Sequence, residues 1–395
     1  MDVNNLTAAA LTAIENNQQF FLNGAAFIFF IIIPFALIIF FLFWRLFRQA
    51  THPLISRARQ NPILEPIKEN PWESEAVFNP AAILHKGRIH LFYRALGQDG
   101  ISRIGHASSA DGVHFDERSP EPVFVPEIPK SAKFKNPFSS PARLPSYNRA
   151  LYASGGGWGG SEDPRAVSID EKIYMTYSSF NGWHSIRLMV TSLNHGYLSN
   201  RDWRWTYPSF LSPAGQVHKN WVLFPEKING KYAILHSISP ELQIEYADEI
   251  EGAEEGLPIQ STYHPRSEKR KNHWDKLVRG AGAPPIKTSK GWLLFYHAHE
   301  PHESHRYKLG AMLLDLKDPT RVLYRSKRPL LEPDMPYEND WKPGIVYVTG
   351  AVIKEGILYL YYGGGDKTVN LATAPLDKFL RELTEEHHKE TEHHN

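Results

Sequence analysis

The chain has 395 residues with 44 basic and 43 acidic side chains, a formal net charge of +1, so no global field favours nucleic acid or an acidic partner. It has no cysteine, which excludes disulfides, thiolate metal sites and cysteine nucleophiles. Aromatic residues make up 12% of the chain, a supply typical of large cores and of surfaces on which sugar rings stack. We expect neither a nucleic-acid partner nor a bound metal.

The N-terminal part contains one long apolar run. No side chain from residue 20 to residue 43 is charged. A helix rising about 1.5 Å per residue would make this run roughly 36 Å long, enough to cross a bilayer core. A cleaved signal peptide is the alternative, but no basic residue precedes the run and no small-residue cleavage site follows it. We therefore expect a short tail over residues 1–19 and a transmembrane helix over residues 20–44.

The charges on either side of this run predict its orientation. Arg45 and Arg48 follow it, whereas only Asp2 and Glu15 precede it. By the positive-inside rule the large C-terminal part should face the cytoplasm, anchored to the lipid bilayer by a single pass. The proline-containing residues 45–70 are expected to form a juxtamembrane linker.

Beyond the linker one pattern occurs five times. A turn with proline or glycine leads into an apolar strand, then a short Lys/Gly or Asn/Gly turn, then a strand that ends in aromatic residues. The five instances are residues 79–95, 162–179, 224–238, 282–298 and 349–366. A sandwich would also give many short strands, but it would not repeat the same turn chemistry. The pattern predicts an all-β fold, a five-bladed β-propeller over residues 71–378, followed by a charged, His-rich tail over residues 379–395.

Polar groups recur where the repeats open. In a propeller the innermost strands run along a central channel, so the residues that open each repeat should converge at one end of it. They are Asn79, Glu162-Asp163, Glu226-Lys227, Ala283-Pro284 and Gly350. Candidates for a shared pocket are Arg94, Asp163, Arg165, Lys227, His236, His297 and Asp366, with Tyr93, Tyr177 and Tyr296 as stacking walls. Carboxylates, bases and aromatic faces together are what glycoside chemistry needs.

Several longer motifs carry a specific resemblance. They are "LFYRA", "RIGHASSADGVHF", "SEDPRAV", "YMTYSS", "NWVLFPEKINGKYAILHS", "RGAGAPPIKTSKGWLLFYHA", "YKLGAMLLDLKDP" and "GAVIKEGILYLYYGGGD". In this order, over about residues 70 to 378, they resemble glycoside hydrolase family 130, the β-mannoside phosphorylases and mannosidases. The apolar N-terminal run is not typical of that family. The resemblance implies a five-bladed β-propeller, an inverting mechanism and a β-linked mannoside as substrate.

The resemblance also implies residue roles. The aspartate of the E-D-P-R motif matches Asp163, which would be the general acid, acting through a sugar hydroxyl while inorganic phosphate attacks the anomeric carbon. The aspartate of the G-G-x-D motif matches Asp366, a partner for sugar hydroxyls. Arg94 and Lys227 fall in matched motifs and would bind sugar or anion.

One departure bears on the reaction. The family's phosphorylases usually continue the L-H pair with arginine and proline, whereas here Ser237 stands in the arginine's place. Losing a fixed cation weakens a phosphate site, although Arg187, Arg279 and Lys219 are candidates to replace it. Hydrolysis is the alternative, with Glu226 or Glu162 considered as the base that activates water.

We therefore predict an inverting glycoside phosphorylase that transfers mannose from β-mannosides to phosphate, giving mannose 1-phosphate. It would need no cofactor besides phosphate as co-substrate. An inverting β-mannoside hydrolase and a glycan-binding propeller without turnover are the alternatives. The sequence leaves a homo-oligomer open and determines neither the linkage nor the acceptor sugar.

Overall fold

The computed structural model describes residues 33, 35, 38–40, 54–125, 157, 159–181, 186–214, 217–253, 256–261 and 273–391. The chain divides into two compact units, Met1–Pro53 and Leu54–Asn395. Of the first unit only the five residues from 33 to 40 are described, and they are helical. The predicted tail of residues 1–19 lies outside the described residues. The second unit begins inside the stretch expected to be a linker.

The predicted transmembrane helix is corrected by the structure. None of the helices in the described ranges is long and apolar enough to cross a membrane. This finding contradicts the helix over residues 20–44, the bilayer as a partner, and the single-pass membrane location with a cytoplasmic domain. Hydropathy was a poor guide because it reports how apolar a run is, whereas a span needs about 20 residues in one continuous helix. Most of the run lies outside the described residues, and Pro34 stands within it.

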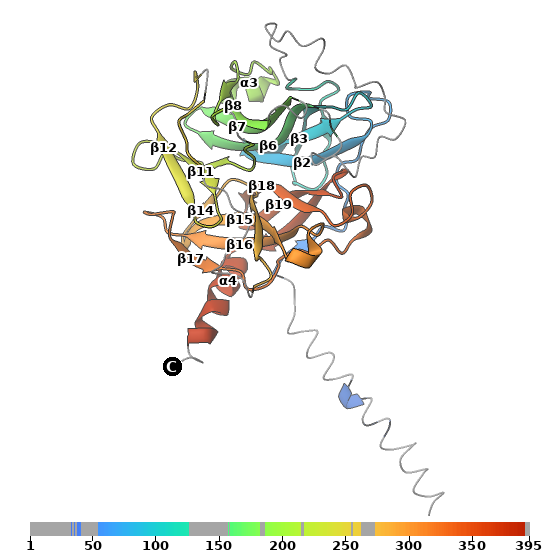
Figure 1. Ribbon diagram of the computed structural model, residues 1–395. Coiled ribbons are helices and arrows are strands. Elements are labelled where there is room, and N and C mark those ends of the chain that lie inside the picture. The colour runs from blue at the N-terminus through green and yellow to red at the C-terminus, as the bar shows by residue number, and fades with distance from the viewer. Residues whose placement is uncertain are drawn as a thin grey trace, which may run out of the picture. The chain divides into compact units, whose positions relative to one another are not determined.

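Antiparallel strands form the Leu54–Asn395 unit, in five successive groups (Figure 1). The first two groups are β2 Ala76–His85, β3 Arg88–Leu96, β4 Ile101–Ser109 and β5 Glu117–Arg118, then β6 Gly159–Ile169, β7 Lys172–Asn181, β8 Ile186–Asn194 and β9 Ser209–Phe210, with helix α3 His195–Asn200 after β8. Two residue pairs join the groups, because β4 and β6 run parallel at Ile101↔Gly159 and Ser102↔Gly160.

The other three groups complete the fold. They are β10 Val222–Leu223, β11 Tyr232–Ser237 and β12 Gln243–Ala247; then β13 Leu277–Ala281, β14 Ile286–Thr288, β15 Gly291–His299, β16 Lys308–Leu314 and β17 Val322–Arg325; then β18 Val346–Lys354, β19 Ile357–Gly364 and β20 Thr368–Pro375. The short 3-10 helices η5 Pro301–Glu303 and η6 Pro336–Glu338 lie in connections. Four of the five repeats found in the sequence each lie on an antiparallel pair of these strands. The third repeat, residues 224–238, contains β11, whose partner β10 ends just before the repeat begins.

The groups are arranged as the blades of a propeller. The innermost strand β18 of the last group lies beside β2 of the first, and β2 contacts β6 (Figure 1). Strand β1, Ser56–Arg57, pairs with β20 in the register Ser56↔Thr373. The start of this unit thereby completes the last sheet and closes the ring.

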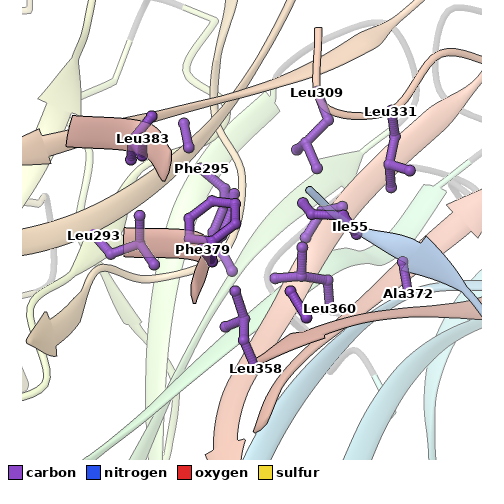
Figure 2. Close-up of a cluster of buried hydrophobic side chains, with 14 of the residues drawn as sticks. Ile55, Leu293, Phe295, Leu309, Leu331, Leu358, Leu360, Ala372, Phe379 and Leu383 are labelled. Carbon is purple, nitrogen blue, oxygen red and sulfur yellow. The ribbon is translucent and has the colours of Figure 1, made fainter. Parts of the chain in front are cut away.

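Helix α4, Leu376–Thr391, follows β20 and covers the last two groups. Phe379 and Leu383 are buried in a cluster with Phe295 of β15 and Leu358 of β19 (Figure 2). The boundary predicted at residue 379, where a charged, His-rich tail was expected to begin, therefore falls inside a helix whose first turns belong to the core.

Three groups share a clamp of tyrosine, carboxylate and arginine. In the first, the Tyr93 hydroxyl donates to Glu73 Oε2 at 2.9 Å and Arg118 Nη2 pairs with the same oxygen at 2.6 Å. The corresponding sets are Tyr296, Asp275 and Arg325, and Tyr362, Glu338 and Arg57. Each clamp satisfies a buried carboxylate with two donors, which a buried charge requires.

Candidate functional site

A cavity of about 390 Å³ lies where the innermost strands converge. Its polar lining consists of Asn79, Arg94, Asp163, His218, Lys219, Asn220, His236, Ser237, Ser261, Arg279, Lys342 and Asp366. Apolar side chains including Ile186, Val217 and Ile238 line the remainder. Six of the predicted site residues therefore meet here: Arg94, Asp163, Lys219, His236, Arg279 and Asp366.

Four of the lining residues have a left-handed backbone. The φ angles are 48° for Asn79, 50° for Asp163, 64° for Asn220 and 53° for Asp366. Among residues with a side chain, asparagine and aspartate tolerate this conformation best, and such strain concentrates at functional sites. The sequence thus places Asn or Asp at the four positions with positive φ where the backbone borders the cavity.

Two glycines explain how Asp163 reaches this position. Gly159 and Gly160 open β6, where the strand runs against β4. A Cβ atom at Gly160 would lie 2.2 Å from the carbonyl oxygen of Ser102, so only glycine permits this approach. The β6 ladder then shifts register between Glu162 and Arg165, and this bulge turns Asp163 toward the cavity.

Asp163 is held by two donors on one carboxyl oxygen. Asn79 Nδ2 donates to Oδ1 at 2.8 Å, and Arg94 Nη1 donates to the same atom at 3.1 Å. Burial alone would raise the pKa of Asp163, but the charges of Arg94, Lys219 and Arg165 and the hydrogen bond from Asn79 outweigh it. The pKa is lowered to about 2, so Asp163 is ionised in the free protein at neutral pH.

Glu162, beside Asp163, is fully buried and points to other partners. Its Oε1 accepts from Arg94 Nη2 at 2.9 Å, and its Oε2 lies 3.5 Å from Lys219 Nζ. Arg94 therefore bridges both acids of the E-D-P-R motif, and its Nε also donates to Ser102 Oγ at 3.0 Å.

Arg165 does not line the cavity. It instead donates hydrogen bonds to residues that do line the cavity or stand next to it. Its Nη1 donates to the carbonyl oxygen of Asp163 at 2.8 Å, and its Nε donates to that of Gly282 at 2.9 Å. Its Nη2 donates to Asn220 Oδ1 and to the Tyr347 hydroxyl, each at 3.1 Å. One buried guanidinium thus connects residues from four of the five groups. Arg165 was predicted to bind substrate, whereas the structure gives it a role in holding the cavity residues in place.

The cavity lining also carries an ion pair and a second arginine. Lys342 Nζ lies 3.1 Å from Asp366 Oδ2, and this carboxylate raises the pKa of Lys342. Arg279 of β13 lies over the Tyr307 ring at 4.9 Å, and its Nε is buried without a partner among the described residues.

Two histidines on the cavity wall are neutral. Trp221 lies between His218 and His236, with ring centroids 5.0 and 5.5 Å away. Burial, with a smaller effect from His218, lowers the pKa of His236 to about 4. A neutral imidazole can both donate and accept, which suits sugar hydroxyls.

Other predicted residues lie elsewhere. His297 is buried under Tyr347 at 4.3 Å between ring centroids, and its Nε2 accepts from the Val348 N–H. Lys227 pairs with Asp170 at a turn, and Arg187 stacks on Phe210 at 3.7 Å. None of these three side chains is among those that line the cavity.

The proposed stacking walls and one candidate base also lie away from the cavity. Tyr93 and Tyr296 belong to the clamps described above, and Tyr177 packs on Phe124 in the core. Glu226 is exposed and pairs with Lys287 at the surface. The aromatic residues that do line the cavity are Trp221, Tyr307 and Tyr347 with Phe180.

Sequence reasoning missed several lining residues. Asn79 was placed near the axis but given no role, although Asn79-Pro80 repeats the Asp163-Pro164 pattern one group earlier. Asn220 and Lys342 lie in connections outside the repeats, so periodicity gave no signal for them.

Most of the chain is similar to known proteins. The sequence profile described as beta-1,4-mannooligosaccharide phosphorylase, that of glycoside hydrolase family 130, matches residues 145–385. The chain belongs to glycoside hydrolase family 130. Among relatives in the family, a "1,2-beta-oligomannan phosphorylase" from Thermoanaerobacter sp. (strain X514) is 35% identical over 80% of this chain and 96% of its own length. A "Beta-1,2-mannobiose phosphorylase" from the same organism is 35% identical over 82% and 98%.

Solved structures of the family share the fold. One, a putative glycoside hydrolase from Parabacteroides distasonis ATCC 8503, is 26% identical with a TM-score of 0.62 and covers 82% of this chain and 97% of its own. A second, also 26% identical with a TM-score of 0.62 over 81% and 93%, comes from work on family members that are "glycoside hydrolases that target beta-1,2 mannosidic linkages in Candida mannan".

Proposed function

We propose that this protein is an inverting glycoside phosphorylase that cleaves β-1,2-linked mannosides with inorganic phosphate. The β-1,2 linkage rests on the names of the two relatives at 35% identity. The observation that carries the phosphorolytic reaction is the charge of the cavity. Among the described residues its lining holds four cations, Arg94, Lys219, Arg279 and Lys342. Cations with fixed geometry are what a phosphate site requires.

The carboxylates of the cavity argue against hydrolysis. An inverting hydrolase needs a second carboxylate to activate water on the face opposite the acid. Of the described lining residues only Asp163 and Asp366 are carboxylates, and Asp366 is paired with Lys342. Glu162 is engaged by Arg94 and Lys219, and Glu226 lies at the surface.

The reaction assigns Asp163 the role of general acid. A phosphate oxygen attacks the anomeric carbon while the bond from that carbon to the bridging oxygen breaks. The Asp163 proton passes to a mannosyl hydroxyl, whose own proton passes to the leaving oxygen. Inversion of a β-mannoside gives α-mannose 1-phosphate and the shortened sugar.

Asp163 has a low pKa in the free protein, and bound phosphate would raise this pKa so that the carboxyl group can carry the proton. Lys219 and Arg94 help to keep the pKa near 2 in the free protein. An anion bound to these cations offsets their charge, which raises the pKa of the neighbouring carboxyl. Binding of phosphate would thereby favour the protonated acid that cleavage needs.

The test is incubation of the purified chain with β-1,2-mannobiose, with and without phosphate. Mannose 1-phosphate formed only when phosphate is present supports the proposal. Free mannose released at the same rate without phosphate would instead establish a hydrolase, as in the family members that act on Candida mannan.

A further inference from the structure

We propose that Asn79 is a positioning residue which, with Arg94, fixes Asp163 so that Oδ2 is the carboxyl oxygen that carries the proton. The inference rests on the proposed role of Asp163 as general acid. Both donors, Asn79 Nδ2 at 2.8 Å and Arg94 Nη1 at 3.1 Å, lie on Oδ1. Among the described residues no donor lies on Oδ2, so this oxygen is left for the sugar hydroxyl.

Asn79 occupies the same place in β2 that Asp163 occupies in β6. Both residues precede a proline, both have a left-handed backbone, and both stand at a shift in strand register. The β2 shift lies between Phe78 and Ala81. Two equivalent corners of neighbouring strands therefore bring an amide and a carboxylate together at the same point of the cavity.

The orientation of the Asn79 amide follows from the carboxylate it faces. An ionised carboxylate only accepts hydrogen bonds, so the amide must turn its NH₂ group toward Asp163. The amide oxygen is then buried without a partner in the described ranges, against Gly363. A Cβ atom at Gly363 would lie 2.0 Å from that oxygen, so the absence of a side chain there makes the orientation sterically feasible.

This orientation destabilises the amide itself. A buried acceptor with no donor loses its hydrogen bonds to water without replacement. The hydrogen bond from the Asn79 amide to Asp163 offsets this loss of hydrogen bonding. It also fixes the orientation of the Asp163 carboxylate. A small displacement of a reacting group can lower a rate about 100-fold.

A carboxylate introduced at position 79 would test the contact with Asp163, because it would change the pKa of the pair. Arg94, Arg165 and Lys219 face Asp163, and Glu162 and the Tyr347 hydroxyl lie close by. Asn79→Asp would place a second carboxylate at the distance of the present hydrogen bond. Two carboxylates that close share a proton, so one apparent pKa of the pair rises.

The experiment measures kcat and KM for β-1,2-mannobiose and phosphate from pH 5 to pH 9 in the full chain. Asn79→Ala should lower kcat by about 10- to 100-fold and leave both KM values within about threefold, because the sugar and phosphate contacts remain. Asn79→Asp should move the basic limb of the profile upward by about one pH unit or more. Asn229→Ala is the control, since Asn229 has φ 53° in an exposed turn outside the cavity.

An Asp163→Asn background separates positioning from a general structural effect. With no acid left to position, Asn79→Ala should cause no further loss there. Wild-type kcat and pH profile in both Asn79 variants, or an equal loss in the Asp163→Asn background, would overturn the inference. If Asn79→Ala does not fold, the similarly sized Asn79→Asp provides the pH readout.

Failure of the proposed function shows in the wild-type protein rather than in the variants. If wild type hydrolyses the mannoside without phosphate, the same comparison is made on hydrolysis, because either route needs the acid. If wild type cleaves no mannoside under any condition, the acid role of Asp163 and this inference are both rejected.

Discussion

The buried guanidinium of Arg165 donates a hydrogen bond to the hydroxyl of Tyr347 at 3.1 Å and so connects β6 with β18. The same hydroxyl donates to Asn220 Oδ1. Tyr347→Phe removes this hydroxyl and keeps the ring that covers His297.

We expect Tyr347→Phe to lower the free energy of unfolding by about 1–3 kcal/mol, because it leaves a buried charge with one partner fewer. Urea unfolding at pH 7 measures this. Tyr207→Phe, at a residue 74% exposed, is the control and should change stability by less than about 0.5 kcal/mol. Equal midpoints for the two variants would show that Arg165 does not depend on Tyr347.

Asp163→Asn should lower turnover strongly, to a small residual rate, without unfolding the protein. Asparagine has nearly the same size and also tolerates a φ of 50°, so the corner should persist. Loss of a general acid lowers kcat by about 10²- to 10⁴-fold. The matched control is Asp170→Asn, an exposed aspartate with φ 53° outside the cavity, which should retain wild-type kcat. Turnover by Asp163→Asn at the wild-type rate would contradict the assignment.

The clamp around Tyr296 predicts that a side chain at Gly310 would destabilise the fold. Gly310 lies opposite Tyr296 in the β15–β16 ladder, and a Cβ atom there would lie 2.4 Å from the tyrosine ring. Gly310→Ala should therefore destabilise the fold by about 1–3 kcal/mol through overpacking. Thermal unfolding tests this against Gly196→Ala in α3, where the nearest atom would be Asn194 Oδ1 at 3.2 Å. A melting temperature unchanged by Gly310→Ala would show that the tyrosine can move aside.

Buried histidines predict loss of stability in acid. His90 Nδ1 and His106 Nε2 lie 3.0 Å apart between β3 and β4. Burial, with smaller effects from nearby groups, lowers the pKa of His90 to about 4 and that of His106 to about 3. Because these values lie below the unfolded pKa of about 6.5, the unfolded state binds protons first as the pH falls.

The stabilisation from neutral His90 and His106 is complete above about pH 6.5 and is lost as the pH falls toward 4. Each group can contribute a slope of at most about 1.4 kcal/mol per pH unit. Urea unfolding between pH 7 and pH 4.5 should show the decline, and it should be shallower for His106→Asn. The same slope in both proteins would assign the acid sensitivity to other groups.

Much of the fold follows from local patterns that the sequence displays. Strand pairs such as β18–β19 consist of apolar and aromatic runs joined by a short Glu-Gly turn, so their positions could be predicted. The apolar run over residues 20–43 was interpreted from hydropathy, which reports composition rather than structure. Lys227 misled because it lies exposed just before the turn that the Ile228–Lys231 bridge closes, where its side chain pairs with Asp170.

The site could be predicted only in part. Asp163 and Arg94 stand in strong motifs, whereas Lys342 and Asn220 reach the cavity from connections whose course depends on the tertiary structure. Tyr93 and Tyr296, which were proposed to stack on sugar rings, instead pack against a tryptophan-carboxylate pair. This pair precedes each tyrosine in the sequence. Trp72-Glu73 and Trp274-Asp275 each place a carboxylate under a tyrosine and a tryptophan beside it.

Ser237 stands where the family's phosphorylases usually have an arginine, so another cation must bind phosphate in the proposed reaction. Substitution of Arg279 is the most direct test of which cation does so. Its Nε is buried without a partner in the described ranges, and its Nη2 makes only a long contact of 3.4 Å to Ser304 O. Arg279→Gln should raise the KM for phosphate by about 10- to 100-fold, because a hydrogen bond to a charged group contributes about 1.5–3 kcal/mol. The KM for the mannoside should change little.

Initial rates with phosphate varied at saturating β-1,2-mannobiose measure the effect of Arg279→Gln. Arg204→Gln is the matched control, because Arg204 is exposed outside the cavity, where it pairs with Asp202 and lies over the Tyr197 ring. If Arg279→Gln raises the mannoside KM and leaves the phosphate KM unchanged, Arg279 belongs to the sugar site. Lys219 would then be the cation to test next, since it lines the cavity and lowers the pKa of Asp163.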